Sequence, residues 1–517
     1  MMVRALVVGA VAGTAWGQCP VSDSFFIGSR DPDFEGRFGI AVAIAGDLMV
    51  IGEREDDQFG SNTGAAHVFR LVDGDWVHEQ KLTASDPQQL AEFGDAVGTD
   101  GESIIVGAPS WDAAGGVVPI AGRAYVFVFD GESWVEEDAF THEDFAIFDS
   151  FGDYVAIDGD RAVIGAPEHD SACEGAPPDI YQNCNSGAAY VFERDGGEWG
   201  QTAKLEASDK ETRDLYGETT AIAGDVIAVG AWSENNTGGP CPPNCSTDGA
   251  GAVYMYRLVE GAWVEEKKLI APDGGNQFGA FGLGLDLDGP GRLLVGSTGD
   301  DEMVPSGGAA YVYEYDADAK DLWVLDGHLI PGDVMIGDFA GASVALEGNV
   351  ALVGSDGDDE DGLFNAGSAY VFVRHEGVWA QQAKFLPPTP EQFEAVGLSV
   401  GLSHGIAVIG APGDNTGMIK AGAAHVLVGI ADCNGNGELD LCEIQDGAPD
   451  KDGDGVLDEC AGCAADCDGN GALNVLDFVC FQGQWQRQAP AGDCDGNGQY
   501  NILDFVCYQG AFQAGCP

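Results

Sequence analysis

Oxygen-bearing side chains recur at metal-binding spacing near the end of the chain. The first set begins at Asp432, has Gly437 at its sixth position and ends on a carboxylate at its twelfth. Its ligands are Asp432, Asn434, Asn436, Glu438, Asp440 and Glu443. Glycine permits the sharp turn, Glu438 offers its backbone carbonyl, and Glu443 can bind through two oxygens. Because Ca²⁺ prefers many hard oxygen ligands, the spacing predicts a calcium site.

A second loop repeats the spacing but lacks its closing ligand. Its side chains are Asp450, Asp452, Asp454 and Asp458. Ala461 stands at the twelfth position, while Glu459 falls at the tenth. We therefore expect a weaker calcium site, or one that shares a ligand from elsewhere.

The last two loops are copies of one another. The ligands of the first copy are Asp466, Asp468, Asn470, Asn474 and Asp477, and those of the second are Asp493, Asp495, Asn497, Asn501 and Asp504. After each loop the sequence reads Phe-Val-Cys, and apolar residues such as Leu476 and Val479 fall on one face of a short predicted helix. Neither helix could bury that face alone, so we expect the two to pack together, with Ca²⁺ contributing folding free energy.

Charge and leader sequence indicate the compartment. The chain has 86 acidic and 22 basic residues and a net charge of -64, which disfavours nucleic-acid binding and favours divalent cations and basic partners. Outside the loops, solvation of an extracellular or salt-adapted surface explains the acids more simply.

Residues 1–17 combine Arg4, an apolar run and Ala15-Trp16-Gly17, which predicts a signal peptide. No later segment is long and apolar enough to span a membrane. The 14 cysteines then predict disulfides, with connectivity open, in a secreted or cell-surface protein.

One phrase, typified by Gly-Ala-Ala-Tyr-Val-Phe, recurs seven times between residues 18 and 430. The copies begin at Gly64, Gly122, Gly187, Gly251, Gly308, Gly367 and Gly422. Two alternating runs precede the phrase, with an aromatic-Gly pair before them in five of the copies, and a Trp-containing run follows six of the copies. Each unit therefore predicts four short strands. Such sheets bury both faces by packing around an axis, so we expect an all-β, seven-bladed β-propeller over residues 18–430.

The last copy lacks its fourth strand. The missing strand is predicted to come from residues 25–27, which would join the two ends of the chain and close the ring. His67 and His425 stand where the other copies have Tyr, so they are interpreted as structural substitutes rather than catalytic residues.

The head and the second run of the units carry a family resemblance. Phe-Gly pairs such as Phe38-Gly39, and Gly-Ala-Pro at residues 107–109, 165–167 and 410–412, resemble the FG-GAP repeats of integrin α-subunit propellers and their bacterial relatives. That resemblance implies calcium loops inside the blades. No blade here has their Asp-x-Asp-x-Asp-Gly spacing, so the acidic loops at 299–302 and 356–361 are interpreted as solvated, and calcium is assigned to the tail.

The tail carries two further resemblances. Residues 431–463 resemble EF-hand and thrombospondin type 3 calcium loops, and residues 464–517 resemble a dockerin, with cysteines at 467, 480, 494 and 507 that are similar to those of dockerin-like tails on exported bacterial proteins. A dockerin implies anchoring to a cohesin-like or cell-envelope partner. The alternative is a tail that calcium and disulfides stabilise and that has no partner.

The sequence contains no recognisable catalytic motif. The prediction is therefore a non-enzymatic adhesion or scaffold protein whose propeller binds an unknown protein or glycan. The alternative is a carbohydrate-active enzyme, a hydrolase or lyase with its active site at the propeller centre. Trp111 and Trp232 lie off the regular Trp strands, so they are candidates for exposed ligand contacts, with packing under a loop as the alternative.

Overall fold

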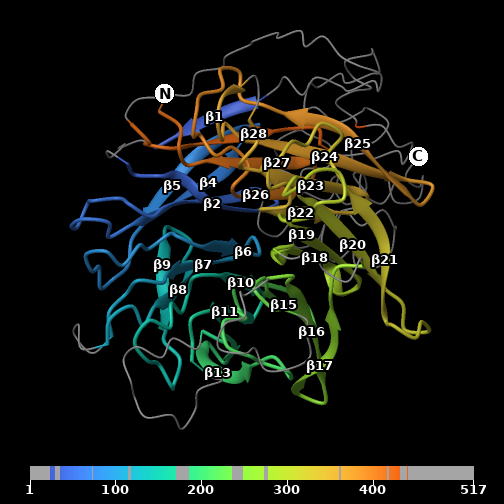
Figure 1. Cartoon of the computed structure of the whole chain (residues 1–517). Helices are drawn as coiled ribbons and strands as arrows, with labels where there is room; N and C mark the ends of the chain where they lie inside the picture. The colour runs from blue at the N-terminus through green and yellow to red at the C-terminus, as the bar shows by residue number, and fades with distance from the viewer. Residues whose placement is uncertain are drawn as a thin grey trace, which may run out of the picture. The chain divides into compact units, whose positions relative to one another are not determined.

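The strands of the chain build seven four-stranded antiparallel sheets that follow one another around a common axis (Figure 1). The computed structural model describes residues 24–29, 35–72, 74–113, 118–170, 185–235, 249–272, 278–359, 362–415, 419–430 and 439, and the seven sheets are those found within these ranges. Each sheet is one blade. The predicted seven-bladed β-propeller is confirmed.

The blades share one strand order, from the axis outward. In blades one to three the strands are β2 (Phe38–Ala45), β3 (Leu48–Glu53), β4 (Ala65–Val72) and β5 (Asp75–Leu82); β6 (Val97–Thr99), β7 (Ser103–Ala108), β8 (Arg123–Phe129) and β9 (Trp134–Phe140); and β10 (Val155–Asp158), β11 (Arg161–Ala166), β12 (Ala188–Asp195) and β13 (Glu198–Leu205). Blades four and five are β14 (Thr219–Ala223), β15 (Val226–Ala231), β16 (Ala252–Val259) and β17 (Ala262–Leu269); and β18 (Phe281–Asp288), β19 (Arg292–Ser297), β20 (Ala309–Tyr315) and β21 (Trp323–Leu329), with a 3₁₀ turn, η2 (Gly289–Gly291), between β18 and β19.

Blades six and seven complete the ring. Their strands are β22 (Val344–Glu347), β23 (Val350–Ser355), β24 (Ser368–His375) and β25 (Val378–Phe385); and β26 (Val400–Ser403), β27 (Ile406–Ala411), β28 (Ala423–Leu427) and β1 (Ser24–Gly28). The phrase that recurs in the sequence is the third strand of every blade, and the Trp-containing run is the fourth strand of six blades.

Burial explains why the middle strands are apolar throughout. Every residue of β3, β7, β15 and β23 is buried, because neighbouring blades cover both faces of the sheet. The outer strand β13 instead alternates exposed and partly buried residues, as a strand at the rim should. The core is thus a series of layers between blades, as in the cluster that joins Val50 and Val68 of blade one to Ile104 and Tyr125 of blade two.

The ring is closed by the first strand of the chain. β1 pairs antiparallel with β28, from Ser24 opposite Leu427 to Gly28 opposite Ala423, and so becomes the outer strand of blade seven. Ile27 is buried in the layer between the last blade and the first. The predicted strand exchange is therefore confirmed.

A second set of contacts joins each blade to the next. The glycine at the head of the third strand forms a parallel bridge to the residue at the aromatic position of the following blade, as between Gly64 and Phe93 or Gly122 and Phe151. The bridge from Gly422 to Phe38 makes the same contact between blade seven and blade one. The recurring sequence motifs therefore mark contacts between blades.

Several predictions from the sequence fall on other residues. The signal peptide, the cysteines and the calcium ligands from Asp432 to Asp504 lie outside the described residues. The chain divides into two units, Met1–Ala431 and Asp432–Pro517, and the propeller strands belong to the first. Within the part that the structure describes, no helix has the length and apolar character needed to cross a membrane.

Candidate functional site

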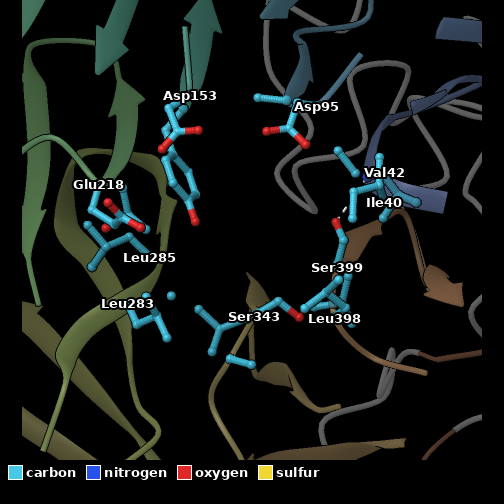
Figure 2. A pocket seen from close by; sticks show the side chains of 18 of the residues that line it. Ile40, Val42, Asp95, Asp153, Glu218, Leu283, Leu285, Ser343, Leu398 and Ser399 are labelled. Carbon is cyan, nitrogen blue, oxygen red and sulfur yellow. Dashed lines mark hydrogen bonds between the residues drawn. The ribbon is translucent and has the colours of Figure 1, made fainter. Parts of the chain in front are cut away.

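The inner strands surround a central cavity of about 700 Å³. The residue after the aromatic-Gly pair lines this cavity in blades one to five, and the residue after the matching Ala-Gly and Val-Gly pairs lines it in blades six and seven. These residues are Ile40, Asp95, Asp153, Glu218, Leu283, Ala342 and Leu398. Its chemistry changes around the ring. Blades two to four present the three acids, which we call the acidic arc, and the other four blades present apolar side chains (Figure 2).

The acidic arc has fewer cations than carboxylates among its lining residues. Arg54 places Nη1 2.7 Å from Oδ1 of Asp95 and is the one basic residue lining the described cavity. Burial, together with nearby carboxylates, raises the pKa of the Asp153 and Glu218 carboxyl groups. An arc of this kind attracts a cation, while the facing apolar residues would accept its carbon skeleton.

Another position that recurs in every blade lies three residues after the second strand. It is occupied by Asp56, Trp111, His169, Glu234, Asp300, Asp358 and Asp414. Its backbone carbonyl accepts a hydrogen bond from the glycine that heads the third strand, at 2.9–3.1 Å in all seven blades. In the sixth blade the Asp358 carboxylate is 2.8 Å from Nζ of Lys384 and accepts a hydrogen bond from the Tyr370 hydroxyl at 3.0 Å. Asp56, Glu234 and Asp300 also contact a basic side chain of the outer strand of their own blade, so these acids help to hold the strands of a blade together.

Blade three departs from this pattern, with histidine at position 169. The His169 ring lies beside a second histidine, His142, and between them stands Asp149. The three side chains are buried, with exposed fractions of 7%, 1% and 1%. Burial alone would raise the pKa of Asp149, but the adjacent imidazole rings of His142 and His169 outweigh it and lower the pKa to about 2. The group is the one cluster of potential metal ligands found in the described ranges.

The two tryptophans proposed as ligand contacts are placed differently. Trp111 is only 9% exposed, and the Arg123 guanidinium lies over its ring at 4.7 Å from the centroid. Trp111 is therefore not an exposed ligand contact, and the alternative of packing under a loop holds for it, because it fills the position that acids or His169 occupy in the other blades. Trp232 is half-buried.

The two histidines at the tyrosine position are part of the core. His67 is buried, and its Nε2 lies 2.7 Å from Oε2 of Glu53. His425 is buried beside Phe385, and burial lowers its pKa to about 4. Their interpretation as structural substitutes is consistent with both environments.

Sequence reasoning missed the central arc and the histidine cluster. The arc could have been found by following the residue after each aromatic-Gly pair, since that position faces the axis in every blade. No local motif signals the cluster, because His169 comes from a different segment than His142 and Asp149.

By its geometry, the chain is a seven-bladed β-propeller whose central cavity is lined mainly by acidic residues on one side and by apolar residues on the other. The family profile described as FG-GAP repeat matches seven segments of the chain, at residues 29–69, 76–127, 134–192, 199–256, 263–313, 323–372 and 379–427. The chain belongs to the FG-GAP repeat family. No curated protein gives a significant match to it.

The matched segments are offset from the blades. The segment 76–127 begins in β5, the outer strand of blade one, and ends in β8, the third strand of blade two. Each sequence repeat thus spans two blades. This offset leaves the last blade without an outer strand, which β1 then supplies.

Buried carboxyl groups predict how stability depends on pH. Burial raises the pKa of Glu394 to about 7 and those of Asp286 and Asp338 to about 6, from ordinary values of 4.5 and 3.8. The folded state therefore keeps protons that the unfolded chain releases, and stability is lost as the pH rises through 6 and 7. We expect a higher Tm at pH 6 than at pH 8, measured by calorimetry at constant ionic strength.

The variant Glu394→Gln separates this effect from general charge repulsion. A rise of one pKa unit corresponds to about 1.4 kcal/mol of unfolding free energy. Removing the titration of Glu394 should therefore measurably narrow the difference in Tm between pH 6 and pH 8. His425 acts in the opposite sense below its ordinary pKa of 6.5, so it offsets part of the gain at pH 6 and would offset more at lower pH. A Tm that is higher at pH 8 would contradict the prediction.

Proposed function

We propose that this FG-GAP propeller is a non-enzymatic binding or scaffold protein that takes a basic group of a protein or glycan ligand into its central cavity. The observation that carries the proposal is the division of the cavity rim. Asp95, Asp153 and Glu218 form one side, and the other side is formed mainly by apolar residues such as Leu283, with one further acid, Asp356 of blade six. A lysine or arginine side chain, or an amino sugar, combines the positive charge and the carbon skeleton that such a rim would accept.

Binding by the full chain tests this proposal. The chain is applied to glycan arrays and to peptides rich in lysine or arginine, with and without calcium. The double variant Asp153→Asn/Glu218→Gln should weaken binding at least tenfold, because it removes two carboxyl groups that a bound cation would draw into their charged form. Asp75→Asn, at an exposed site in β5, removes one charge away from the cavity and should leave binding unchanged. Equal binding by both variants would refute the role of the arc.

We further propose that the protein is exported and binds Ca²⁺ through its tail. The support is the leader sequence of residues 1–17 and the four loops that begin at Asp432, Asp450, Asp466 and Asp493. Calcium titration of the full chain should show at least three sites, and Asp466→Asn with Asp493→Asn should remove two of them. Fewer sites, or no change in the variants, would contradict these loop assignments.

The tail is proposed to anchor the propeller. The resemblance of residues 464–517 to a dockerin supports a cohesin-like or cell-envelope partner. Capture of the full chain on an immobilised cohesin, in calcium and in a chelator, tests the point. Calcium-dependent capture that Asp466→Asn abolishes would support anchoring, and no capture would favour a tail with a stabilising role only.

A second candidate is a carbohydrate-active enzyme with its site in the same cavity. The observation in its favour is the raised pKa of Asp153 and Glu218, since a protonated carboxyl group can act as a general acid. Turnover of any glycan by the wild-type chain, lost in the same double variant, would replace the binding proposal with this one.

A further inference from the structure

Two histidines and an aspartate meet at the junction of blades two and three. His142 and Asp149 come from the segment between β9 and β10, and His169 follows β11. The position of His142, two residues after the outer strand, is held by alanine or proline at most other junctions, namely by Ala84, Ala207, Ala271, Pro331 and Pro387. Both histidines are thus departures from the repeat, and they occur at the same place.

The two rings lie between two carboxylates. On the inner side, Oδ2 of Asp149 is 3.3 Å from Nε2 of His142, and Oδ1 is 3.1 Å from Nδ1 of His169. On the outer side, Asp144 faces the remaining nitrogens, at 3.0 Å from Nδ1 of His142 and 3.6 Å from Nε2 of His169. One ligand atom from each of His142, Asp149 and His169 lies within 4.8 Å of the others.

The hydrogen-bond pattern leaves one nitrogen facing a carboxylate without a hydrogen bond. Asp144 accepts a hydrogen bond from the Nδ1–H group of His142, which leaves Nε2 of the neutral ring with a free lone pair. That Nε2 atom is buried and has no hydrogen-bond partner among the residues that the structure describes, although Asp149 is close. A lone pair and a carboxylate oxygen repel each other unless a cation lies between them. Either a proton or a metal ion can fill that role.

We propose that His142, Asp149 and His169 form a binding site for a divalent transition metal, with Zn²⁺ as the best chemical fit. Two imidazoles and one carboxylate are ligands that Zn²⁺ accepts in tetrahedral geometry, with the fourth position open to water. Ca²⁺ prefers oxygen ligands only and is disfavoured here. Asp144 is the outer carboxylate that orients metal-bound histidines in zinc sites.

Lys204 would have to give up one of its contacts when a metal binds. Its Nζ atom lies 2.9 Å from Nε2 of His169 and 2.7 Å from Oδ2 of Asp144. A metal at Nδ1 of His169 moves the ring proton to Nε2, so Lys204 must give up that nitrogen and keep Asp144. The bound metal would join the segment between the blades to blade three, and so stabilise this junction.

Titration with Co²⁺, an optical probe for zinc sites, tests the proposal. The full chain is kept in excess Ca²⁺, which saturates oxygen-ligand sites, and visible absorption is followed. We expect one equivalent of Co²⁺ to give a band that Zn²⁺ abolishes by displacement, and Zn²⁺ to raise the Tm. The variant His142→Ala, which introduces the residue found at other junctions, should lose the band and weaken Co²⁺ binding at least tenfold.

Two further variants keep the test decisive. His169→Asp introduces the aspartate that faces an outer-strand lysine in blades one and six, so it should fold and also lose the band. His375→Ala alters an exposed histidine in β24 and should bind Co²⁺ as the wild type does. A wild-type chain without a Co²⁺ band, or a band that survives in both His142→Ala and His169→Asp, would overturn the proposal.

Discussion

A chain that lacks residues 20–35 is expected to lose the closure of its ring and to unfold at a markedly lower temperature. The deletion removes β1, which provides the outer strand of blade seven, and leaves the outer edge of β28 without its partner. It also removes Ile27 from the layer between the last and first blades. Loss of one buried aliphatic side chain alone costs about 2–5 kcal/mol, and the lost strand pairing adds to this.

The measurement compares two chains, one that begins at residue 18 and one that also lacks residues 20–35. Calorimetry should show a fall in Tm of several degrees or more, and hydrogen exchange should become faster first in β28. The point variant Ile27→Asp tests the same contact without shortening the chain. Val378→Asp, at a 66% exposed position of the outer strand β25, is its matched control and should change little. Unchanged unfolding of the deletion would contradict ring closure by β1.

The repeated architecture was predictable because each blade solves the same packing problem. Seven copies of one strand pattern require seven sheets, and the missing Trp run after His425 pointed to an outer strand from elsewhere. The residues 25–27 supplied the pattern for that strand. Periodicity of this kind survives in the sequence because every blade must cover both faces of its neighbours.

Features that break the repeat were not predictable. In the six blades whose fourth strand follows directly in sequence, the register between third and fourth strands shifts at one point, as between Val68 and Phe69, whereas β28 and β1 pair without a shift. Such a bulge depends on the partner strand, which a local pattern does not reveal.

Trp111 shows how one substitution is compensated by another. Where Asp358 in blade six meets Lys384 of the outer strand, blade two has Trp111 and, at the place of the lysine, Ala139. A large ring replaces an ion pair and becomes buried. Considered alone, its position in a loop suggested exposure, because the register that places Ala139 there appears only in the folded sheet.

Alanine in place of Gly94 or Gly107 is expected to destabilise the propeller more than alanine at any exposed turn. These residues are the glycine of a Phe-Gly pair and the first residue of a Gly-Ala-Pro run. A Cβ atom on Gly94 would lie 2.1 Å from the backbone oxygen of Ala65, in the preceding blade. A Cβ atom on Gly107 would lie 1.9 Å from the backbone oxygen of Gly152, in the following blade. Backbone atoms cannot move aside singly, so two blades would have to separate.

The two glycines also distinguish backbone strain from steric collision as causes of the lost stability. Gly94 has a φ of +93°, which itself strains an alanine, whereas Gly107 has no positive φ and suffers only the collision. Gly131, in the exposed turn after β8, has a φ of +99° and open space around its Cβ position, so Gly131→Ala measures the strain alone. That strain costs about 1–3 kcal/mol.

Denaturant unfolding of the three alanine variants tests the prediction. Gly107→Ala and Gly94→Ala should each cost more than about 4 kcal/mol, a loss that marks disruption of packing, or should prevent folding. Gly131→Ala should remain folded with a modest loss. A Gly107→Ala chain as stable as Gly131→Ala would mean that the blades can separate locally. If the three variants lose stability in the expected order, the glycines of the family motifs are required for packing one blade against the next. The ligand-binding residues would then have to be sought among positions that vary around the ring, such as Asp95, Asp153 and Glu218.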